Sequence, residues 1–207
     1  MREKNIDDFC AELASKAPVP GGGAAAALTG AFAASLASMV SELTRGKKKY
    51  AEYEEDVVRI GEKARKLSVR LLELASEDAG CFKVVSDAYA VRAVSDEEKV
   101  SKAAMLEQAL KGACVPPTEM LEKLSEAAEL FVSLSDKGSK LLISDTGAGA
   151  ALCAGAARAS VLAVCANTRL MTDRGEASLM EERAFKLLSD IKEKTDLAYS
   201  KALKYLT

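Results

Sequence analysis

A long apolar seam runs through the middle of the sequence. Hydrophobic side chains recur there at alternating spacings of three and four residues, at Val57, Ile60, Ala64, Leu67, Leu71, Leu74, Cys81, Val85 and Ala88, and Asp78 takes one place in the series. This spacing is typical of an α-helix that packs lengthwise against neighbouring helices. It predicts one continuous helix from about Tyr50 to Arg92, with a single carboxylate, that of Asp78, in its apolar face.

Boundary signals divide the N-terminal part of the chain. Asn5 is a suitable N-cap for a first helix, which should end near Pro18. Residues 18–23 then combine two prolines with three glycines, which breaks regular structure. A helix rich in small residues, over residues 24–44, is predicted after this loop.

Four further helices are predicted in the C-terminal half, over residues 95–115, 118–138, 146–170 and 179–206. Ser95 and Glu98 form a capping box at the start of the first of these helices. Thr118 is expected to cap the second helix, and Ser144 with Asp145 the third.

The composition agrees with an all-α fold. Of the 207 residues 49% are hydrophobic, but only 5% are aromatic and only four are prolines, which favours helices over strands. We expect a bundle of about seven helices that includes the long central helix and forms a single domain over residues 1–207. The uneven supply of large apolar side chains suggests a seam shared with a second subunit, and therefore a homodimer.

Charge narrows the range of partners. A net charge of -2 and a pI of about 5.5 provide no field that attracts nucleic acid. Charged residues, among them Asp7 and Asp8, crowd the start of the chain where a signal peptide would be apolar. The uncharged stretch from Ala24 to Ser41 consists mainly of small residues and fits a buried helix better than a membrane span. We therefore expect a cytoplasmic protein with no membrane partner.

The absence of histidine limits the chemistry further. It excludes Ser-His and Cys-His nucleophile pairs and imidazole zinc sites, and the five cysteines are never spaced as C-x-x-C. Proton transfer must use Asp, Glu, Lys, Tyr or Cys. Asp78 is the leading candidate, because burial beside Leu71, Leu74, Cys81 and Phe82 would raise its pKa toward the range useful for acid–base catalysis. A structural role for the buried carboxylate is the alternative.

Two other features are compatible with ligand binding. The loop with Gly21, Gly22 and Gly23 precedes a helix N-terminus, where backbone amides bind anions, although a tight turn explains it as well. Lys47 and Lys48 fit an acidic ligand, but cations at this place also complement the end of the preceding helix.

Taken in order, these motifs resemble a known family. Residues 18–24 (PVPGGGA), residues 46–50 (GKKKY), Asp78-Ala79-x-x-Phe82, Ser144-Asp145 and Asn167 are similar to the formimidoyltetrahydrofolate cyclodeaminase and methenyltetrahydrofolate cyclohydrolase family. The similarity extends over nearly the whole chain.

The resemblance implies an all-helical, dimer-forming enzyme that acts on one-carbon tetrahydrofolates, with Asp78 as the catalytic acid–base group. It implies a substrate site for the pterin and its glutamate tail formed by Gly21, Gly22, Gly23, Lys47, Lys48, Ser144, Asp145 and Asn167. The expected reaction is the cyclodeaminase reaction, in which ammonia leaves as 5,10-methenyltetrahydrofolate forms; a cyclohydrolase and a non-catalytic folate-binding protein are the alternatives. Neither a tightly bound cofactor nor a metal is implied.

The chain departs from the family pattern at three positions. Ala24 replaces a serine, Ser139 an asparagine, and Ala163 an asparagine. Each change removes or alters a polar group at an implied pocket position, and a lost buried hydrogen-bond partner costs about 1 to 3 kcal/mol.

Overall fold

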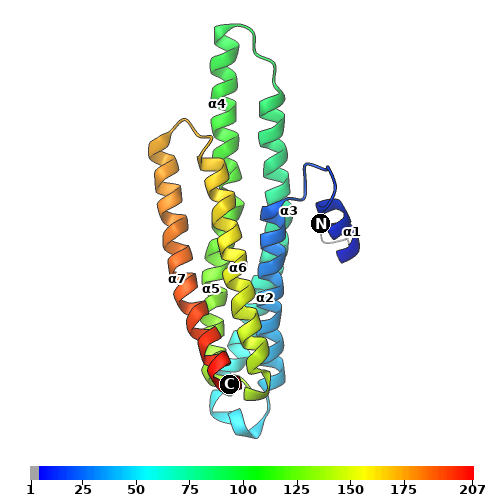
Figure 1. Cartoon of the computed structure of the whole chain (residues 1–207), viewed down its shortest axis with the longest axis vertical. Coiled ribbons are helices and arrows are strands. Elements are labelled where there is room, and N and C mark those ends of the chain that lie inside the picture. Colours follow the sequence, from blue (N-terminus) through cyan, green and yellow to red (C-terminus); the bar gives the residue numbers. More distant parts are fainter. Residues whose placement is uncertain (1–4) are drawn as a thin grey trace.

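The computed structural model of the chain describes residues 5–207, so the first four residues of the charged start lie outside the described part. The helices run up and down along one long axis (Figure 1). In order they are α1 (Ile6–Leu13), α2 (Gly22–Thr44), the 3₁₀ helix η1 (Lys48–Tyr53), α3 (Glu54–Ala90), α4 (Asp96–Ala113), α5 (Val115–Lys137), the 3₁₀ helix η2 (Lys140–Leu142), α6 (Ile143–Thr168) and α7 (Arg174–Leu206). Residues 5–207 contain no strand, which confirms the all-α prediction.

The long helix α3 buries its predicted seam. All the seam residues from Val57 to Leu74 are buried, as are Val85 and Ala88, whereas Asp78 and Cys81 are partly exposed. The helix begins later than predicted because residues 48–53 form a 3₁₀ helix, which the Tyr50 hydroxyl anchors by accepting a hydrogen bond from the backbone N–H of Lys140 (2.8 Å).

Two small-residue helices, α2 and α6, lie side by side along the bundle (Figure 1). Their small side chains let neighbouring helices approach closely. At Gly149 of α6, for example, an added Cβ would overlap the fully buried ring of Phe131 from α5. By length and composition α2 and the segment 140–168 would both suit a membrane span, but core helices meet the same criteria, and about half of each apolar stretch is buried within the chain.

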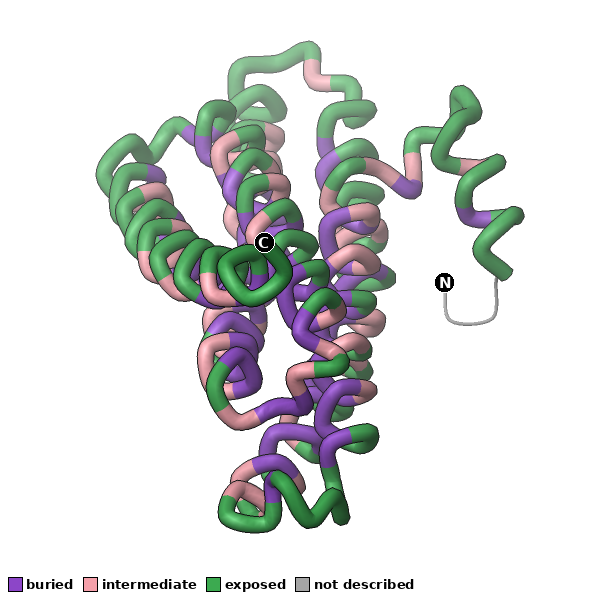
Figure 2. Tube along the Cα trace, turned by 60° about the horizontal axis from the view of Figure 1, so that its bottom comes forward, coloured by how far each residue is buried: buried purple, intermediate pink, exposed green. Residues whose placement is uncertain are grey.

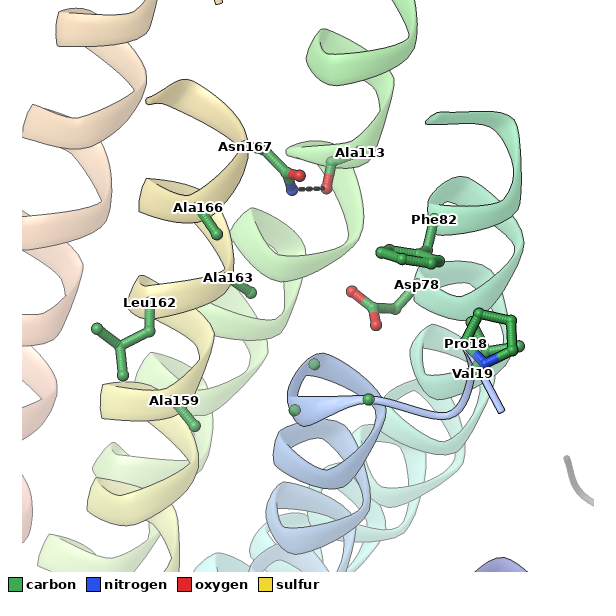
Figure 3. A pocket seen from close by; sticks show the side chains of 13 residues that line it. Pro18, Val19, Asp78, Phe82, Ala113, Ala159, Leu162, Ala163, Ala166 and Asn167 are labelled. Carbon is green, nitrogen blue, oxygen red and sulfur yellow. Dashed lines mark hydrogen bonds between the residues drawn. The ribbon is translucent and has the colours of Figure 1, made fainter. Parts of the chain in front are cut away.

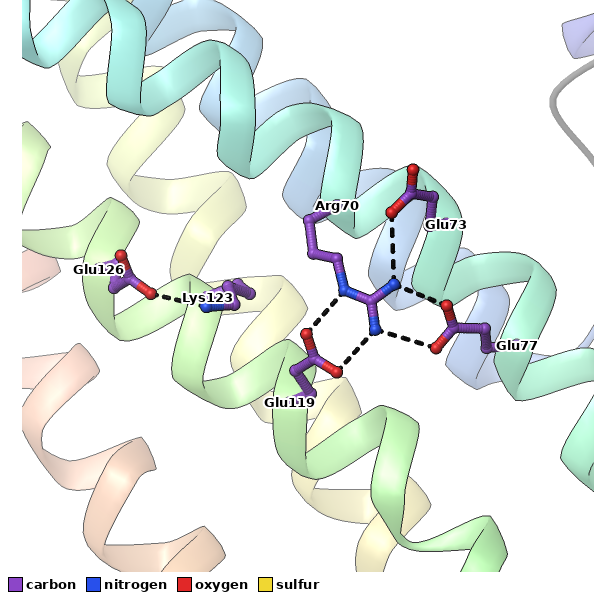
Figure 4. A network of polar contacts seen from close by, with 6 residues as sticks. All are labelled: Arg70, Glu73, Glu77, Glu119, Lys123 and Glu126. Atoms are coloured by element: carbon purple, nitrogen blue, oxygen red, sulfur yellow. Dashed lines mark hydrogen bonds and ion pairs between the residues drawn. The ribbon is translucent and has the colours of Figure 1, made fainter.

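An ion-pair network fastens α3 to α5 (Figure 4). The Arg70 guanidinium donates through Nε and Nη2 to the two carboxylate oxygens of Glu119, at 2.7 Å each, and through Nη1 and Nη2 to Glu77 at 2.6 and 3.0 Å. The hydrogen bonds from Arg70, together with its charge, favour the ionised carboxylate and lower the pKa of Glu119. Bidentate pairing fixes the relative position of the two helices more strictly than a single contact would.

The prediction that Thr118 caps the helix after α4 is wrong. Helix α5 starts at Val115, and Pro116 and Pro117 lie in its first turn, where the missing N–H of proline has no hydrogen bond to lose. The Thr118 hydroxyl donates to the carbonyl of Cys114 (2.7 Å) and caps nothing.

Ser144 and Asp145 also do not cap α6. This helix starts at Ile143, so both residues lie in its first turn, and Leu142 at the N-cap makes no side-chain hydrogen bond. Helix α7 likewise begins earlier than predicted, because the Asp173 carboxylate accepts a hydrogen bond from the backbone N–H of Glu176 (3.0 Å) and caps the helix there.

Other predicted boundaries are confirmed. Asn5 caps α1 by accepting from the backbone N–H of Asp8 (2.8 Å), and the capping box of Ser95 and Glu98 is complete at α4. Helix α1 ends at Leu13, before the predicted limit, and stands to one side of the bundle (Figure 2). Buried residues gather along the inner faces of the other helices (Figure 2).

Candidate functional site

A pocket of about 410 Å³ opens at the end of the bundle where α2 begins. It lies between the loop before α2, the first turn of α2, the C-terminal part of α3, the end of α4 and the C-terminal part of α6 (Figure 3). Its lining residues are Pro18, Val19, Gly21, Gly22, Gly23, Asp78, Phe82, Ala113, Ala159, Leu162, Ala163, Ala166 and Asn167. Segments far apart in the sequence thus meet around one cavity.

The Asp78 side chain points from α3 toward the start of α2 (Figure 3). Its carboxylate accepts a hydrogen bond from the backbone N–H of Ala24, in the first turn of α2. An added Cβ at Gly23 would lie 2.6 Å from the Asp78 Cγ, well inside van der Waals contact. Glycine at position 23 therefore lets the carboxylate sit over the helix N-terminus, where backbone N–H groups lack partners within the helix.

Burial raises the pKa of Asp78 above the ordinary aspartate value, and the hydrogen bond from Ala24 lowers it to a smaller extent. The carboxylate lines the pocket and can therefore reach a ligand. A carboxyl group with a raised pKa in a cleft is suited to exchange protons with a bound molecule.

Asn167, on α6, lies across the pocket from Asp78 (Figure 3). Its Nδ2 donates a hydrogen bond to the carbonyl oxygen of Ala113 at 3.0 Å. The opposite orientation of the amide would place two acceptor oxygens against each other, so this bond fixes the side chain. The amide oxygen remains as an acceptor for an N–H group of a ligand.

Among residues 5–207, Asp78 carries the only charged side chain in the pocket lining, and no lysine or arginine of this range lines it. Most of the remaining lining is apolar. Within residues 5–207 no group of three or more His, Cys, Asp or Glu side chains is placed to hold a metal ion.

Phe82 also lines the pocket; it was expected as an apolar neighbour of Asp78, but not as a site residue. It lies off the apolar seam and its side chain is 47% exposed, yet it lines the cavity one helical turn after Asp78. The sequence contained a usable signal: a large aromatic residue four positions after the seam carboxylate lies on nearly the same side of the helix.

The remaining predicted site residues lie at the opposite end of the bundle. Lys47 and Lys48 follow the C-terminus of α2, and Ser144 and Asp145 open α6 (Figure 1). Because α2 has 23 residues, the two ends are about 35 Å apart along the helix. One chain therefore brings together Gly21, Gly22, Gly23, Asp78 and Asn167, but not the other four.

The three departures from the family pattern are divided in the same way. Ala163 lines the pocket, and Ala24 is fully buried beside it and contributes its backbone N–H. Ser139 belongs to the opposite end, where its hydroxyl accepts a hydrogen bond from Lys47 Nζ at 3.3 Å.

Comparison with known proteins gives concordant results. A family model described as formiminotransferase-cyclodeaminase matches residues 5–186. The chain is 38% identical over 180 residues to a methenyltetrahydrofolate cyclohydrolase of Methylorubrum extorquens, which covers 87% of this chain and 85% of that protein. It is 25% identical over 197 residues to the formimidoyltransferase-cyclodeaminase of Mus musculus, and there it spans 95% of this chain but only 36% of the relative. The crystal structure of a formiminotetrahydrofolate cyclodeaminase from Thermotoga maritima matches with a TM-score of 0.82 and 29% identity, over 99% of this chain and 96% of that one.

Proposed function

Since the chain belongs to the formiminotransferase-cyclodeaminase family of folate-acting enzymes, we propose that it is a 5,10-methenyltetrahydrofolate cyclohydrolase with its active site in the pocket around Asp78. From the sequence alone, the cyclodeaminase reaction was the expected one. The order changes because the relative named as a cyclohydrolase is 38% identical, whereas the mouse and Thermotoga maritima proteins, which are named for a cyclodeaminase, are 25% and 29% identical. The observation that carries the proposal is the half-buried Asp78 carboxylate in a pocket to which residues 5–207 contribute no other acid.

In the proposed reaction a water molecule adds to the cationic methenyl carbon. The Asp78 carboxylate accepts a proton from this water as the new C–O bond forms. It returns the proton to N5 as the C–N5 bond breaks, and the proton of the resulting hydroxyl group leaves to solvent as the formyl group forms on N10. The negative carboxylate also stabilises the cationic carbon electrostatically.

The cyclodeaminase reaction is the second candidate, which the similarity to the Thermotoga maritima enzyme over nearly the full chain supports. There N10 attacks the formimino carbon, Asp78 accepts the N10 proton, and the same proton passes to the departing ammonia nitrogen. Both reactions need one group that alternates between base and acid. The transferase activity in the name of the mouse protein is not proposed for this chain, which spans about a third of that relative.

A pair of assays separates these functions. We expect the purified protein to accelerate loss of the methenyl chromophore from 5,10-methenyltetrahydrofolate beyond its spontaneous rate. Formation of that chromophore with release of ammonia from 5-formiminotetrahydrofolate would instead favour the cyclodeaminase. Asp78→Asn should lower kcat by about 10² to 10⁴; a variant with full turnover would overturn the role of Asp78. Folate binding without turnover of either substrate would identify the non-catalytic alternative.

We also propose that the protein is a homodimer in which α2 and α6 form the contact surface. The exposed residues of α6 between Ala148 and Ala166 are small or apolar apart from Arg158, and Leu162 among them is 70% exposed. On α2, Phe32 and Leu43 are exposed in the same way. Burial of such surface is favourable and typical of permanent subunit contacts.

A two-fold axis perpendicular to the bundle would place opposite ends of the two chains side by side. Lys47 and Lys48 of one subunit would then approach the Asp78 pocket of the other, together with Ser144 and Asp145. In this arrangement the lysines supply the positive charge that the pocket of one chain lacks, and they suit the carboxylates of a glutamate tail. We propose a cytoplasmic enzyme whose only small-molecule requirement is the tetrahydrofolate substrate, with no tightly bound cofactor and no nucleic-acid or membrane partner.

A further inference from the structure

Phe82 presents an aromatic ring to the pocket without being part of the core. Its side chain is 47% exposed, although a phenyl ring gains free energy from burial. Figure 3 shows the ring nearly edge-on, just above the Asp78 carboxylate. The ring and the carboxylate therefore face the same space.

The wall opposite Phe82 is built from small side chains. Ala159, Ala163 and Ala166 of α6 line the cavity there. Alanine methyl groups leave open the space that a larger side chain would fill. These small side chains leave room in the cavity for a flat molecule beside the phenyl ring.

The charge of the lining favours a cation in this space. Within the part of the chain that the structure describes, the Asp78 carboxylate is its only charged group and no cationic side chain lines it. The face of an aromatic ring carries partial negative charge and attracts cations. The carboxylate and the ring thus attract the same kind of group from two sides.

We propose that Phe82 is a specificity-determining residue that stacks on the planar, cationic one-carbon ring of the bound folate and distinguishes it from neutral folates. This inference rests on the proposed function, because 5,10-methenyltetrahydrofolate carries such a cation. The formyl product of the proposed hydrolysis carries no charge at this carbon. Phe82 therefore holds the substrate more strongly than the product and favours product release.

The test compares Phe82→Leu with the wild-type protein, because leucine keeps an apolar side chain but removes the aromatic face. We expect the KM for 5,10-methenyltetrahydrofolate to rise about five- to tenfold, with a smaller change in kcat. The inhibition constant of unsubstituted tetrahydrofolate, which lacks the cation, should change by less than about twofold. Phe82→Tyr, which keeps an aromatic face, should retain the wild-type KM.

Tyr89→Leu is the matched control. Tyr89 is also an aromatic residue of α3 and is 46% exposed, but it does not line the pocket, so its replacement should leave both constants unchanged. A wild-type KM in Phe82→Leu, or an equal rise in KM and in the inhibition constant, would overturn the inference while the proposed function stands. If the wild-type protein neither turns over nor binds any folate, the proposed function fails and this inference fails with it.

Discussion

The Asp78 carboxylate lies under two opposing influences. Burial in the pocket raises its pKa, and the backbone N–H of Ala24 lowers it, with burial the larger effect. The folded chain therefore holds the Asp78 proton to a higher pH than an unfolded chain does. A carboxyl group with a raised pKa is a better base than an ordinary aspartate, but its ionised form destabilises the folded state.

Asp78→Asn should therefore stabilise the protein, or leave its stability unchanged, at pH 7. Because the pKa of Asp78 is higher in the folded than in the unfolded state, the protonated carboxyl group stabilises the folded state. This contribution to stability is fully present below the unfolded pKa of about 3.9 and is lost as the pH rises through the folded pKa. Asparagine carries no charge at any of these pH values. Thermal unfolding should show the variant melting at an equal or higher temperature at pH 7, with the difference shrinking toward pH 4. A clearly lower melting temperature at pH 7 would contradict this interpretation.

Gly23→Ala should reduce activity strongly without unfolding the protein. The new methyl group would overlap the Asp78 carboxylate, which must move away from its place over α2. Displacement of a catalytic group by about 1 Å costs on the order of 10²-fold in rate. Steady-state kinetics beside a circular dichroism melt would separate the two effects.

Gly80→Ala is the control for this substitution. Gly80 lies on α3 two residues after Asp78, and an added Cβ there meets no atom within 4 Å. Alanine in a helix interior is favoured over glycine by about 0.5 to 1 kcal/mol. We expect normal kinetics and a slightly higher melting temperature; equal losses of activity in both variants would show that Gly23 has no special role.

The site residues that interrupt a pattern could be predicted from the sequence. Asp78 stood out because it is a charge in an apolar seam, and the glycines because they break a helix. Phe82 was expected as an apolar neighbour of Asp78 and as part of a motif, but not as a site residue, because an aromatic residue off the seam resembles an ordinary surface position. The contribution of Ala24 was also hidden, because it comes from the backbone N–H, which every residue except proline carries.

The contact between α5 and α6 depends on Gly149, which has no side chain. The Phe131 ring, which is fully buried, occupies the place where a Cβ of Gly149 would lie. Both backbones are held by further core contacts, so neither helix can retreat freely. Closely packed interiors of this kind respond to a single added methyl group.

Gly149→Ala should destabilise the protein by about 1 to 3 kcal/mol through overpacking, in spite of the better helix propensity of alanine. Urea unfolding should show a lower midpoint with an unchanged slope. Gly80→Ala, where the same substitution meets open space, should shift the midpoint in the opposite direction. A stabilised Gly149→Ala variant would mean that the Phe131 ring can move aside at little cost.

Helix existence followed from the sequence more reliably than helix starts. The periodicity predicted the seam of α3 correctly because burial of that face decides the outcome. The starts of α5 and α6 were misplaced, because proline is as compatible with a first helical turn as with a stop, and because Ser144 and Asp145 suit a first turn as well as a cap. Local propensity alone does not choose between such neighbouring positions.

At the scale of the whole molecule, the bundle separates the predicted site residues into two groups. The pocket with Asp78 lies at one end, and Lys47 and Lys48 lie at the other. The order of the motifs along the chain did not predict this separation, because the direction in which each helix runs is set by packing. A homodimer with antiparallel subunits is the simplest arrangement that would unite the two groups.

Leu162→Glu should convert the proposed dimer into monomers. Leu162 is 70% exposed on the apolar face of α6, and a buried, unpaired carboxylate in a subunit contact would be strongly unfavourable. Sedimentation velocity should show half the wild-type mass. Leu179→Glu, at a 68% exposed leucine on α7, should leave the mass unchanged. A wild-type protein that sediments as a monomer at micromolar concentration would contradict the proposal.

The overlap between Gly23 and Asp78 restricts the paths that substitution can take. A side chain at position 23 is excluded as long as an aspartate occupies position 78 in its present rotamer. Loss of the carboxylate first would remove the restriction, but it would also remove the proposed activity. The two positions should therefore show epistasis. Gly23→Ala would lower the activity strongly in the wild-type background, but it would cause little further loss after Asp78→Ala. Among descendants of this sequence, a residue other than glycine at position 23 would indicate a lineage that has already lost the proposed activity.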